Sequence, residues 1–298
     1  MLRMCVVETR PSVLALFALR FAAGAVLGAQ TLGAGDGSFL QAAGTALVWV
    51  FAIFAVYLFN GVEDVQEDQA NESSRPIAKG ELAPGAALGV TCVAALAAIA
   101  GATHLPAPIG WMVPILLLLG YMYSGPPFHL KRRSAGTAVI GIVASLMTYA
   151  AGFMSHTEGW AARTEMLVVF TIAVSLWTGL VGGLTKDLSD IEGDAAAGRR
   201  TLGVTRGEGV VRLLAATAAL GTACAFGVAV VVWQLPLLAA AVIMLTGAVT
   251  LVVVTLGPLS QGSRSRRRRP YRAYMVTQYV VHLFLVGSMV ISPVAWPT

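Results

Sequence analysis

Two clusters of acidic residues, each directly after an apolar run, are the part of this sequence whose residue types and spacing indicate chemistry. In the first cluster Asn60, Asp64 and Asp68 are four residues apart, with Glu63 and Glu67 between them. At about 100° per residue, positions four and eight apart stay close to one face of a helix. The spacing therefore predicts a ladder of oxygen ligands on a helix that continues past the apolar run.

The second cluster contains Asp187, Asp190 and Asp194, which are separated by three, four and seven residues. These spacings also place three carboxylates on one helical face, provided that the helix continues beyond its apolar part. The sequence thus predicts a second ladder, again at the end of a hydrophobic segment.

Two facing carboxylate ladders are typical of a site that holds Mg²⁺ on a diphosphate. Magnesium commonly binds through one or two carboxylates together with phosphate oxygens of the substrate. Acids crowded at a membrane boundary repel one another, and a bound cation relieves that cost. The alternative is that both clusters are solvated loop acids, the usual meaning of a charge run. Two clusters with helical spacing, each after an apolar run, favour the metal site.

A third segment, residues 123–132, reads Tyr-Ser-Gly-Pro-Pro-Phe-His-Leu-Lys-Arg. Pro126 and Pro127 must end the preceding helix, because proline cannot continue the backbone hydrogen bonds. Tyr123 is then expected at the lipid boundary and Lys131 in a loop, where an ammonium group can contact diphosphate oxygens. Interfacial anchoring by Tyr123 and a purely topogenic charge at Lys131 remain the alternatives.

The elements that position these residues are predicted to be membrane helices, because 57% of the 298 residues are hydrophobic and only 12% are charged. Apolar runs near the roughly 20 residues needed to cross a bilayer recur along the whole chain. We therefore expect an all-α polytopic protein with a single membrane domain, residues 1–298, and an acidic cavity on the cytoplasmic side. The nine predicted spans are residues 12–30, 39–60, 84–103, 107–124, 137–156, 166–184, 210–233, 236–256 and 274–295.

The distribution of positive charge predicts the topology. When successive loops are assigned to alternate sides of the membrane, 18 of the 20 Lys and Arg residues lie on one side. The exceptions are Arg20, within the first span, and Arg163, on the opposite side. By the positive-inside rule the amino terminus and both acidic loops face the cytoplasm, so we expect a protein of the plasma (inner) membrane. The arginine run at 264–269 is predicted to be topogenic and to bind anionic lipid. The net charge of +5 is explained by topology, which removes the argument for a nucleic-acid partner.

Arg20 is costly in lipid and is therefore expected to face the bundle interior. There it would contact the diphosphate or an acidic group of a second substrate. Pairing with a buried carboxylate, or extension of the side chain towards the membrane surface, explains it equally well. The three cysteines are scattered without a pair or Cys/His spacing, which excludes zinc and iron–sulfur sites.

These segments together resemble the UbiA superfamily of intramembrane prenyltransferases over nearly the whole chain. The Asn60, Asp64, Asp68 pattern is similar to the first aspartate-rich motif of that family, and Asp190 and Asp194, with Asp187, to the second. Residues 75–80, 123–132 and 198–202 resemble its Arg-Pro, Tyr-Ser-x-Pro-Pro and Gly-x-x-Thr-Leu segments. The sequence departs from the family at Gly61, where many members carry Asp.

The resemblance implies Mg²⁺-dependent transfer of an isoprenyl group from an isoprenyl diphosphate to an aromatic acceptor, a phenol or quinone precursor, with release of diphosphate. The expected partners are these two substrates and membrane lipid. The expected metal ligands are Asn60, Asp64, Asp68, Asp187, Asp190 and Asp194. The expected diphosphate-binding residues are Arg75, Lys131, Lys186 and Arg20, and the expected catalytic residues are Asp190, Lys131 and Tyr123, with Asp190 as the proton acceptor.

Two other functions are compatible with parts of this pattern. A UbiA-type terpene cyclase would use the same acidic ladders, but a double bond of the same isoprenoid chain would capture the cation. A membrane transporter would also carry acids within the membrane. Here the acids lie at span ends and no inverted repeat is evident, so the sequence favours an enzyme.

Overall fold

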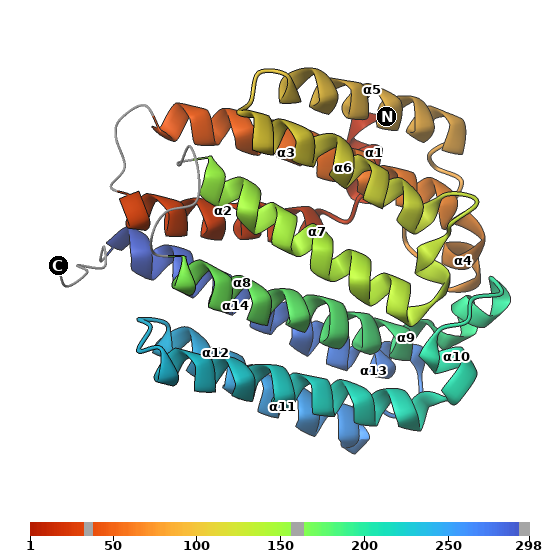
Figure 1. The fold of residues 1–298 in the computed structure, drawn as a ribbon. Helices are drawn as coiled ribbons and strands as arrows, with labels where there is room; N and C mark the ends of the chain where they lie inside the picture. Colours follow the sequence, from red (N-terminus) through yellow and green to blue (C-terminus); the bar gives the residue numbers. More distant parts are fainter. Residues whose placement is uncertain (33–37, 156–163, 292–298) are drawn as a thin grey trace.

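The computed structural model describes residues 1–32, 38–155 and 164–291, and within these ranges every regular element is helical (Figure 1). Nine of the described helical segments are long and apolar enough to cross a membrane, which confirms the predicted fold class. The crossing elements are α2 (Pro11–Leu32), α3 (Ser38–Glu63), α5 (Pro84–Ala102), α6 (Ala107–Ser124), α7 (Ser134–Met154), α8 (Glu165–Leu176) with η2 (Trp177–Gly182) and α9 (Gly183–Ala196), α11 (Glu208–Val232), α12 (Leu238–Leu256) and α14 (Arg269–Ile291).

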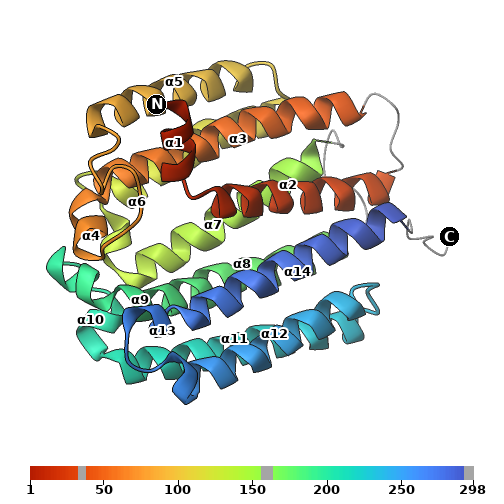
Figure 2. The ribbon, with the colours of Figure 1, turned by 180° about the vertical axis from the view of Figure 1, so that it is seen from behind.

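Short helices connect these segments. They are α1 (Leu2–Glu8), α4 (Val65–Ala70), η1 (Leu130–Arg132), α10 (Leu202–Arg206), η3 (Pro258–Ser260) and α13 (Arg264–Arg267). Figures 1 and 2 show α4, α10 and α13 gathered at one end of the bundle, around the end of α9. The polar segments of the sequence thus meet at a single end of an otherwise apolar bundle.

The sixth span differs most from its prediction. It was expected to end at residue 184, but α8 continues through the π-helical turn η2 into α9 and ends at Ala196. Hydropathy marks only the apolar part of a helix, whereas backbone hydrogen bonding carries the same helix into the polar stretch. The last span is also displaced, since α14 begins at Arg269, and residues 292–298 and Arg163 lie outside the described ranges.

Glycine allows α2 and α7 to pack closely. A side chain at Gly24 would overlap the backbone of Tyr149, and one at Gly152 would overlap the backbone of Phe21. Small residues let membrane helices approach until their backbones touch, which increases the van der Waals contact between them. Both helices contribute side chains to the wall of the apolar cavity described below.

Candidate active site

The first acidic ladder is interrupted at its middle residue. Helix α3 ends at Glu63, and Asp64 adopts φ −98° and ψ 6° before α4 begins, so the predicted uninterrupted helix is wrong at this point. The Asp68 N–H still donates to the Asp64 carbonyl oxygen at 2.8 Å, which preserves the helical spacing across the break. Both carboxylates approach Nη1 of Arg75, Asp68 at 2.5 Å and Asp64 at 3.8 Å.

Asp64 is the most heavily paired acid of this ladder. Its Oδ1 lies 2.7 Å from Lys131 Nζ and 2.8 Å from Arg199 Nη2, and all three side chains are buried. Burial by itself would raise the pKa of Asp64, but Lys131 and Arg199 hold it well below its usual range. Burial conversely lowers the pKa of Lys131. Asn60 lies apart, since its Nδ2 donates to Ser124 Oγ at 3.0 Å.

Glu67, which the sequence placed off the ligand face, belongs to the cluster. It forms an ion pair with Arg199 and is buried on α4. Burial, followed by the negative charge of Asp64, raises the pKa of Glu67 to about 8. The first cluster therefore contains one carboxylate whose pKa is lowered, Asp64, and one whose pKa is raised, Glu67.

The second ladder lies on α9 as predicted, but its three aspartates have different surroundings. Asp194 lies 3.5 Å from Arg199 Nη1 and accepts a hydrogen bond from Thr201 at 3.1 Å. Asp190 lies 3.9 Å from Lys186 Nζ. Asp187 instead accepts a hydrogen bond from Ser134 at 2.5 Å.

Arg199 joins the two ladders. It pairs with Asp64 and Glu67 of the first cluster and with Asp194 of the second. The Asn71 side chain also packs against the α9 backbone here, because a Cβ at Gly193 would overlap the Asn71 side-chain amide. Sequence reasoning recognised the segment 198–202 as a motif but gave no signal for which of its two arginines enters the site.

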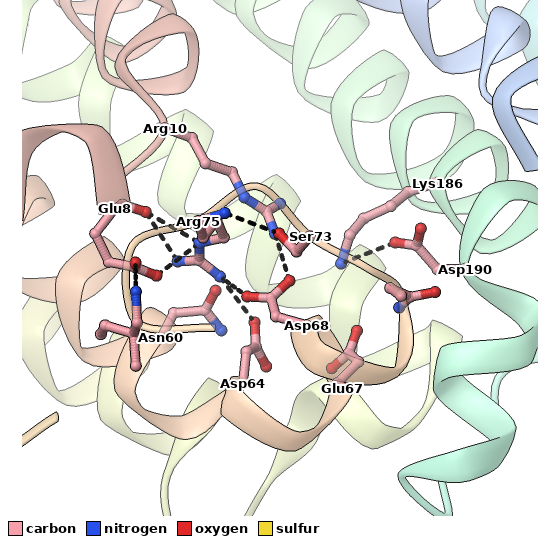
Figure 3. Close-up of polar contacts among 12 residues, drawn as sticks. Glu8, Arg10, Asn60, Asp64, Glu67, Asp68, Ser73, Arg75, Lys186 and Asp190 are labelled. Atoms are coloured by element: carbon pink, nitrogen blue, oxygen red, sulfur yellow. Dashed lines mark hydrogen bonds and ion pairs between the residues drawn. The ribbon is translucent and has the colours of Figure 1, made fainter. Parts of the chain in front are cut away.

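Glu8 and Arg75, which Figure 3 shows side by side, fill the space beside Gly61. A Cβ at Gly61 would lie 2.5 Å from Glu8 Oε1 and 2.6 Å from Arg75 Nη2. Glu8 Oε1 lies 2.7 Å from Arg75 Nε, and the Glu8 backbone carbonyl accepts from Arg75 Nη2 at 2.9 Å. Burial raises the pKa of Glu8. Gly61 itself carries no carboxylate, and one from α1 occupies the adjacent space.

The prediction that the 264–269 run is only topogenic and lipid-binding is incomplete. Arg264 Nη1 donates to the Asn71 carbonyl at 2.6 Å, and its Nε donates to the Ser189 carbonyl at 3.1 Å. Its Nη2 lies 3.4 Å from Asp190 Oδ1. Arg264 therefore connects the segment after α4 with α9, across the opening between the two ladders. Nothing in a run of arginines indicates which member turns inward.

Two adjoining cavities lie along this cluster. One, of about 310 Å³, is polar and is lined by Glu67, Asp68 and Asp190 among others. The second, of about 170 Å³, is mostly apolar and extends into the bundle. Residues that line both are Arg10, Val13, Lys186 and Tyr271. The aromatic residues of the apolar cavity are Phe17, Tyr57, Tyr123, Tyr271 and Tyr274. Tyr123, which was predicted to be catalytic, lines the apolar cavity, whereas Asp190 lines the polar cavity and not the apolar one.

Arg20 lies on the apolar cavity and not in the acidic cluster. Its Nη2 donates to Thr178 Oγ1 and to Gln278 Oε1, each at 2.9 Å, and the residue is 2% exposed. No carboxylate of the described residues forms an ion pair with it. The structure therefore does not bring Arg20 together with the other predicted diphosphate-binding residues.

The donor set of the cluster fits a hard divalent cation. Asp64, Glu67, Asp68, Asp190 and Asp194 offer only carboxylate oxygens, which Mg²⁺ prefers. Over the described parts of the chain, no three acidic, His or Cys side chains are already gathered for a metal. The ion pairs explain this, because Arg75, Lys131 and Arg199 neutralise the same carboxylates.

Comparison with known proteins identifies the family of the chain. The sequence profile of the UbiA prenyltransferase family matches residues 17–294. The chain belongs to the UbiA prenyltransferase family. Membership confirms the family predicted from the two ladders and assigns the chain to a family of prenyltransferases.

Relatives of this UbiA family member differ in the reactions that their names describe. A diterpene cyclase of Hericium erinaceus is 28% identical over 78% of this chain and 71% of its own length. Coumarin 8-geranyltransferase 1 of Citrus limon is 27% identical, and the match covers 58% of this chain and only 44% of that protein. A UbiA homologue from Archaeoglobus fulgidus, solved with GPP and Mg²⁺, has the same fold, with a TM-score of 0.69, 15% identity and coverage of 93% of this chain and 99% of that one.

Proposed function

We propose that this protein transfers an isoprenyl group from an isoprenyl diphosphate to an aromatic acceptor in a Mg²⁺-dependent reaction. The observation that carries the proposal is the pair of adjoining cavities, one polar and one apolar, with Arg10, Lys186 and Tyr271 at their boundary. An isoprenyl diphosphate has the same division into a charged head and an apolar tail. The Archaeoglobus fulgidus homologue with GPP and Mg²⁺ and the geranyltransferase relative support the donor class.

The head would lie in the polar cavity between the ladders. Glu67, Asp68 and Asp190 line this cavity, and Asp64 and Asp194 are connected to Glu67 through Arg199. These five carboxylates would hold Mg²⁺, which supplies Lewis-acid stabilisation of the charge on the leaving diphosphate. Arg75, Lys131, Lys186 and Arg199 now pair with these carboxylates and would contact diphosphate oxygens. Asn60 and Asp187, which bond to Ser124 and Ser134, would contribute less.

In the proposed reaction the bond between the first donor carbon and the diphosphate oxygen breaks, and its electron pair leaves with the diphosphate. A ring carbon of the acceptor supplies the electron pair of the new carbon–carbon bond and then loses its proton. Asp190 remains the predicted proton acceptor, although its place on the polar cavity favours a role in holding the head group. The apolar cavity, with Tyr123 in its wall, would exclude water that could capture the allylic cation.

We also propose that the acidic end of the bundle faces the cytoplasm at the plasma membrane. The support is the distribution of Lys and Arg, which gather at the end where α4, α10 and α13 meet. Labelling of single cysteines placed at exposed Glu81 and exposed Trp233 would test the orientation in intact cells. Labelling of position 81 from outside would contradict it.

The decisive test is diphosphate release by the purified protein in lipid nanodiscs. Geranyl, farnesyl and geranylgeranyl diphosphates would be offered with and without Mg²⁺, together with a panel of phenolic acceptors, and products identified by mass spectrometry. We expect release that requires both Mg²⁺ and an acceptor and that is abolished by EDTA. Absence of release with every donor and acceptor would contradict the proposal.

Terpene cyclisation is the second candidate, favoured by the diterpene cyclase relative and by the aromatic wall of the apolar cavity. Faces of aromatic rings stabilise cations, so five rings around the cavity could accompany an internal cyclisation. The same assay separates the two functions. A cyclised hydrocarbon formed without acceptor would support the cyclase, whereas a prenylated phenol would support transfer.

A further inference from the structure

A separate cavity of about 640 Å³ lies at the beginning of α7. It lies between the turn that follows α6 and the segment that follows α9. The described residues that line it are distinct from those that line the two cavities of the candidate site. This α7 cavity is therefore separate from the site that the two ladders form.

Three exposed arginines give the α7 cavity a positive charge. Arg132 belongs to η1, Arg133 precedes α7, and Arg200 follows α9. No carboxylate of the described residues lines the cavity or forms an ion pair with any of the three. Ala135 and Gly136, in the first turn of α7, also line it, so the positive end of that helix adds to the attraction for an anion. Guanidinium groups gathered without a counter-charge favour a phosphate.

The arginine run at 264–269, to which lipid binding was first assigned, is partly neutralised by the protein. Arg264 lies 3.4 Å from Asp190, and Arg267 forms an ion pair with Glu192. The α7 cavity differs because its guanidinium groups have no carboxylate partner in the described chain. An anion from the membrane would therefore meet more uncompensated charge at the α7 cavity than at the inward-facing members of the run.

Apolar side chains continue the α7 cavity towards the membrane. Phe128 is 51% exposed and Val139 is 57% exposed, and both line the cavity. Val139 lies five residues after the start of α7, which corresponds to about 7 Å along the helix axis. Since α7 is long and apolar enough to cross a membrane, an exposed apolar side chain on it faces lipid. The cavity thus has a charged end at the polar side of the bundle and an apolar end in the membrane, as a phospholipid has.

The α7 cavity lies behind a backbone link that serves the candidate active site. The Arg200 N–H donates to the Arg132 carbonyl oxygen at 2.8 Å. The residues just before these two, Arg199 and Lys131, are buried and lie 2.8 Å and 2.7 Å from Asp64 Oδ1. An anion that binds Arg132 and Arg200 together would add a second connection between the two segments. Its binding should therefore stabilise the folded protein.

We infer that the α7 cavity binds an anionic phospholipid, with the phosphate on Arg132, Arg133 and Arg200 and an acyl chain along Phe128 and Val139. Basic pockets between membrane helices on the cytoplasmic side bind the head groups of anionic lipids. The lipid is a structural ligand and not a reactant, so the inference is independent of the proposed prenyl transfer.

The test is thermal unfolding of the purified full-length protein in micelles of an uncharged detergent, without donor or metal. Phosphatidylglycerol is added in one series, and phosphatidylcholine with the same acyl chains in the other. Because a ligand that binds only the folded state stabilises it, we expect phosphatidylglycerol to raise the melting temperature by a few degrees more than phosphatidylcholine. Combining Arg132→Gln, Arg133→Gln and Arg200→Gln should abolish this difference, and Arg200→Gln alone should retain part of it.

The matched control combines Arg206→Gln, Arg266→Gln and Arg272→Gln. These arginines are also exposed, have no carboxylate partner among the described residues and lie outside the α7 cavity. The control variant loses the same charge and should keep the preference for phosphatidylglycerol. An equal response of the wild type to the two lipids would overturn the inference. A preference that both triple variants lose alike, or that both retain, would overturn it as well.

Two water-soluble probes, glycerol 3-phosphate and inorganic phosphate, distinguish a lipid from a free phosphate. Both should stabilise the protein less than phosphatidylglycerol at equal concentration, since neither has an acyl chain to contact Phe128 and Val139. A soluble phosphate that raises the melting temperature as much as phosphatidylglycerol would contradict a lipid as the occupant. None of these measurements requires diphosphate release. A protein that shows the lipid preference but transfers no isoprenyl group would retain the lipid site and contradict only the proposed function.

Discussion

The two acidic ladders have nearly the same spacing in sequence, yet they differ in how the structure holds them. The first is broken at Asp64, and residues from three other segments, Arg75, Lys131 and Arg199, bind its carboxylates. The second lies on the unbroken helix α9, and one of its members, Asp187, accepts a hydrogen bond from Ser134. Equal spacing therefore does not imply equal roles, because the partners that come from elsewhere in the chain differ.

The largest effect is expected where the ladders meet. Asp64→Asn and Asp194→Asn should each lower kcat by about 10²- to 10³-fold, because each removes a charge that would hold the metal–diphosphate complex. Steady-state diphosphate release measures this. Glu81→Gln is the matched control. Glu81 is exposed, and among the described residues its carboxylate forms an ion pair only with Lys79 Nζ, at 3.9 Å. Activity retained in both aspartate variants would contradict the shared site.

The second ladder should separate into two kinds of residue. Asp190→Asn should lower kcat/KM by about 10- to 100-fold, the range for a group that orients a metal or diphosphate. Asp187→Asn should change activity less than Asp190→Asn and should lower the melting temperature, because Ser134 bonds both Asp187 and the Leu202 backbone. Diphosphate release and thermal unfolding, measured on the same preparations, distinguish the two. The reverse order of the activity losses would show that Asp187 turns into the cluster.

Arg264 should matter more than its neighbours in the arginine run. Arg264→Ala should raise the KM for the donor by about tenfold, because it removes the link between Asp190 and the segment after α4. Arg266→Ala is the matched control, since Arg266 is exposed and belongs to the same short helix. Equal effects of the two variants would support a purely topogenic or lipid-binding run.

The smallest effect concerns Glu67 in the first cluster and the stability of the metal-free protein. The Glu67 pKa is raised from 4.5 to about 8 on folding, so the folded state binds more protons than the unfolded state between these values. This contribution to stability is complete below the lower value and is lost as pH rises through the upper one. The melting temperature should therefore fall by a few degrees between about pH 5 and about pH 8.5. Glu67→Gln should flatten this part of the profile, and an unchanged slope would contradict the assignment.

The sequence determined the fold class, the number of membrane segments and the location of both ladders. These follow from local properties, since hydrophobic runs define the spans and a three- or four-residue spacing defines a helical face. The predicted break at Pro126 and Pro127 is likewise local, and helix α6 does end at Ser124. Family membership, indicated by the same motifs, was confirmed by the match to residues 17–294.

Only the tertiary structure decided which charges face one another. Arg199 lies 135 residues from Asp64, and Arg264 lies 74 residues from Asp190, so neither pair has a local signal. The same holds for Glu8, whose carboxylate lies beside Gly61, and for Arg20, whose partners come from η2 and α14. Ion pairs and buried hydrogen bonds depend on distances of a few ångströms between helices, and those distances are set by packing along the whole bundle.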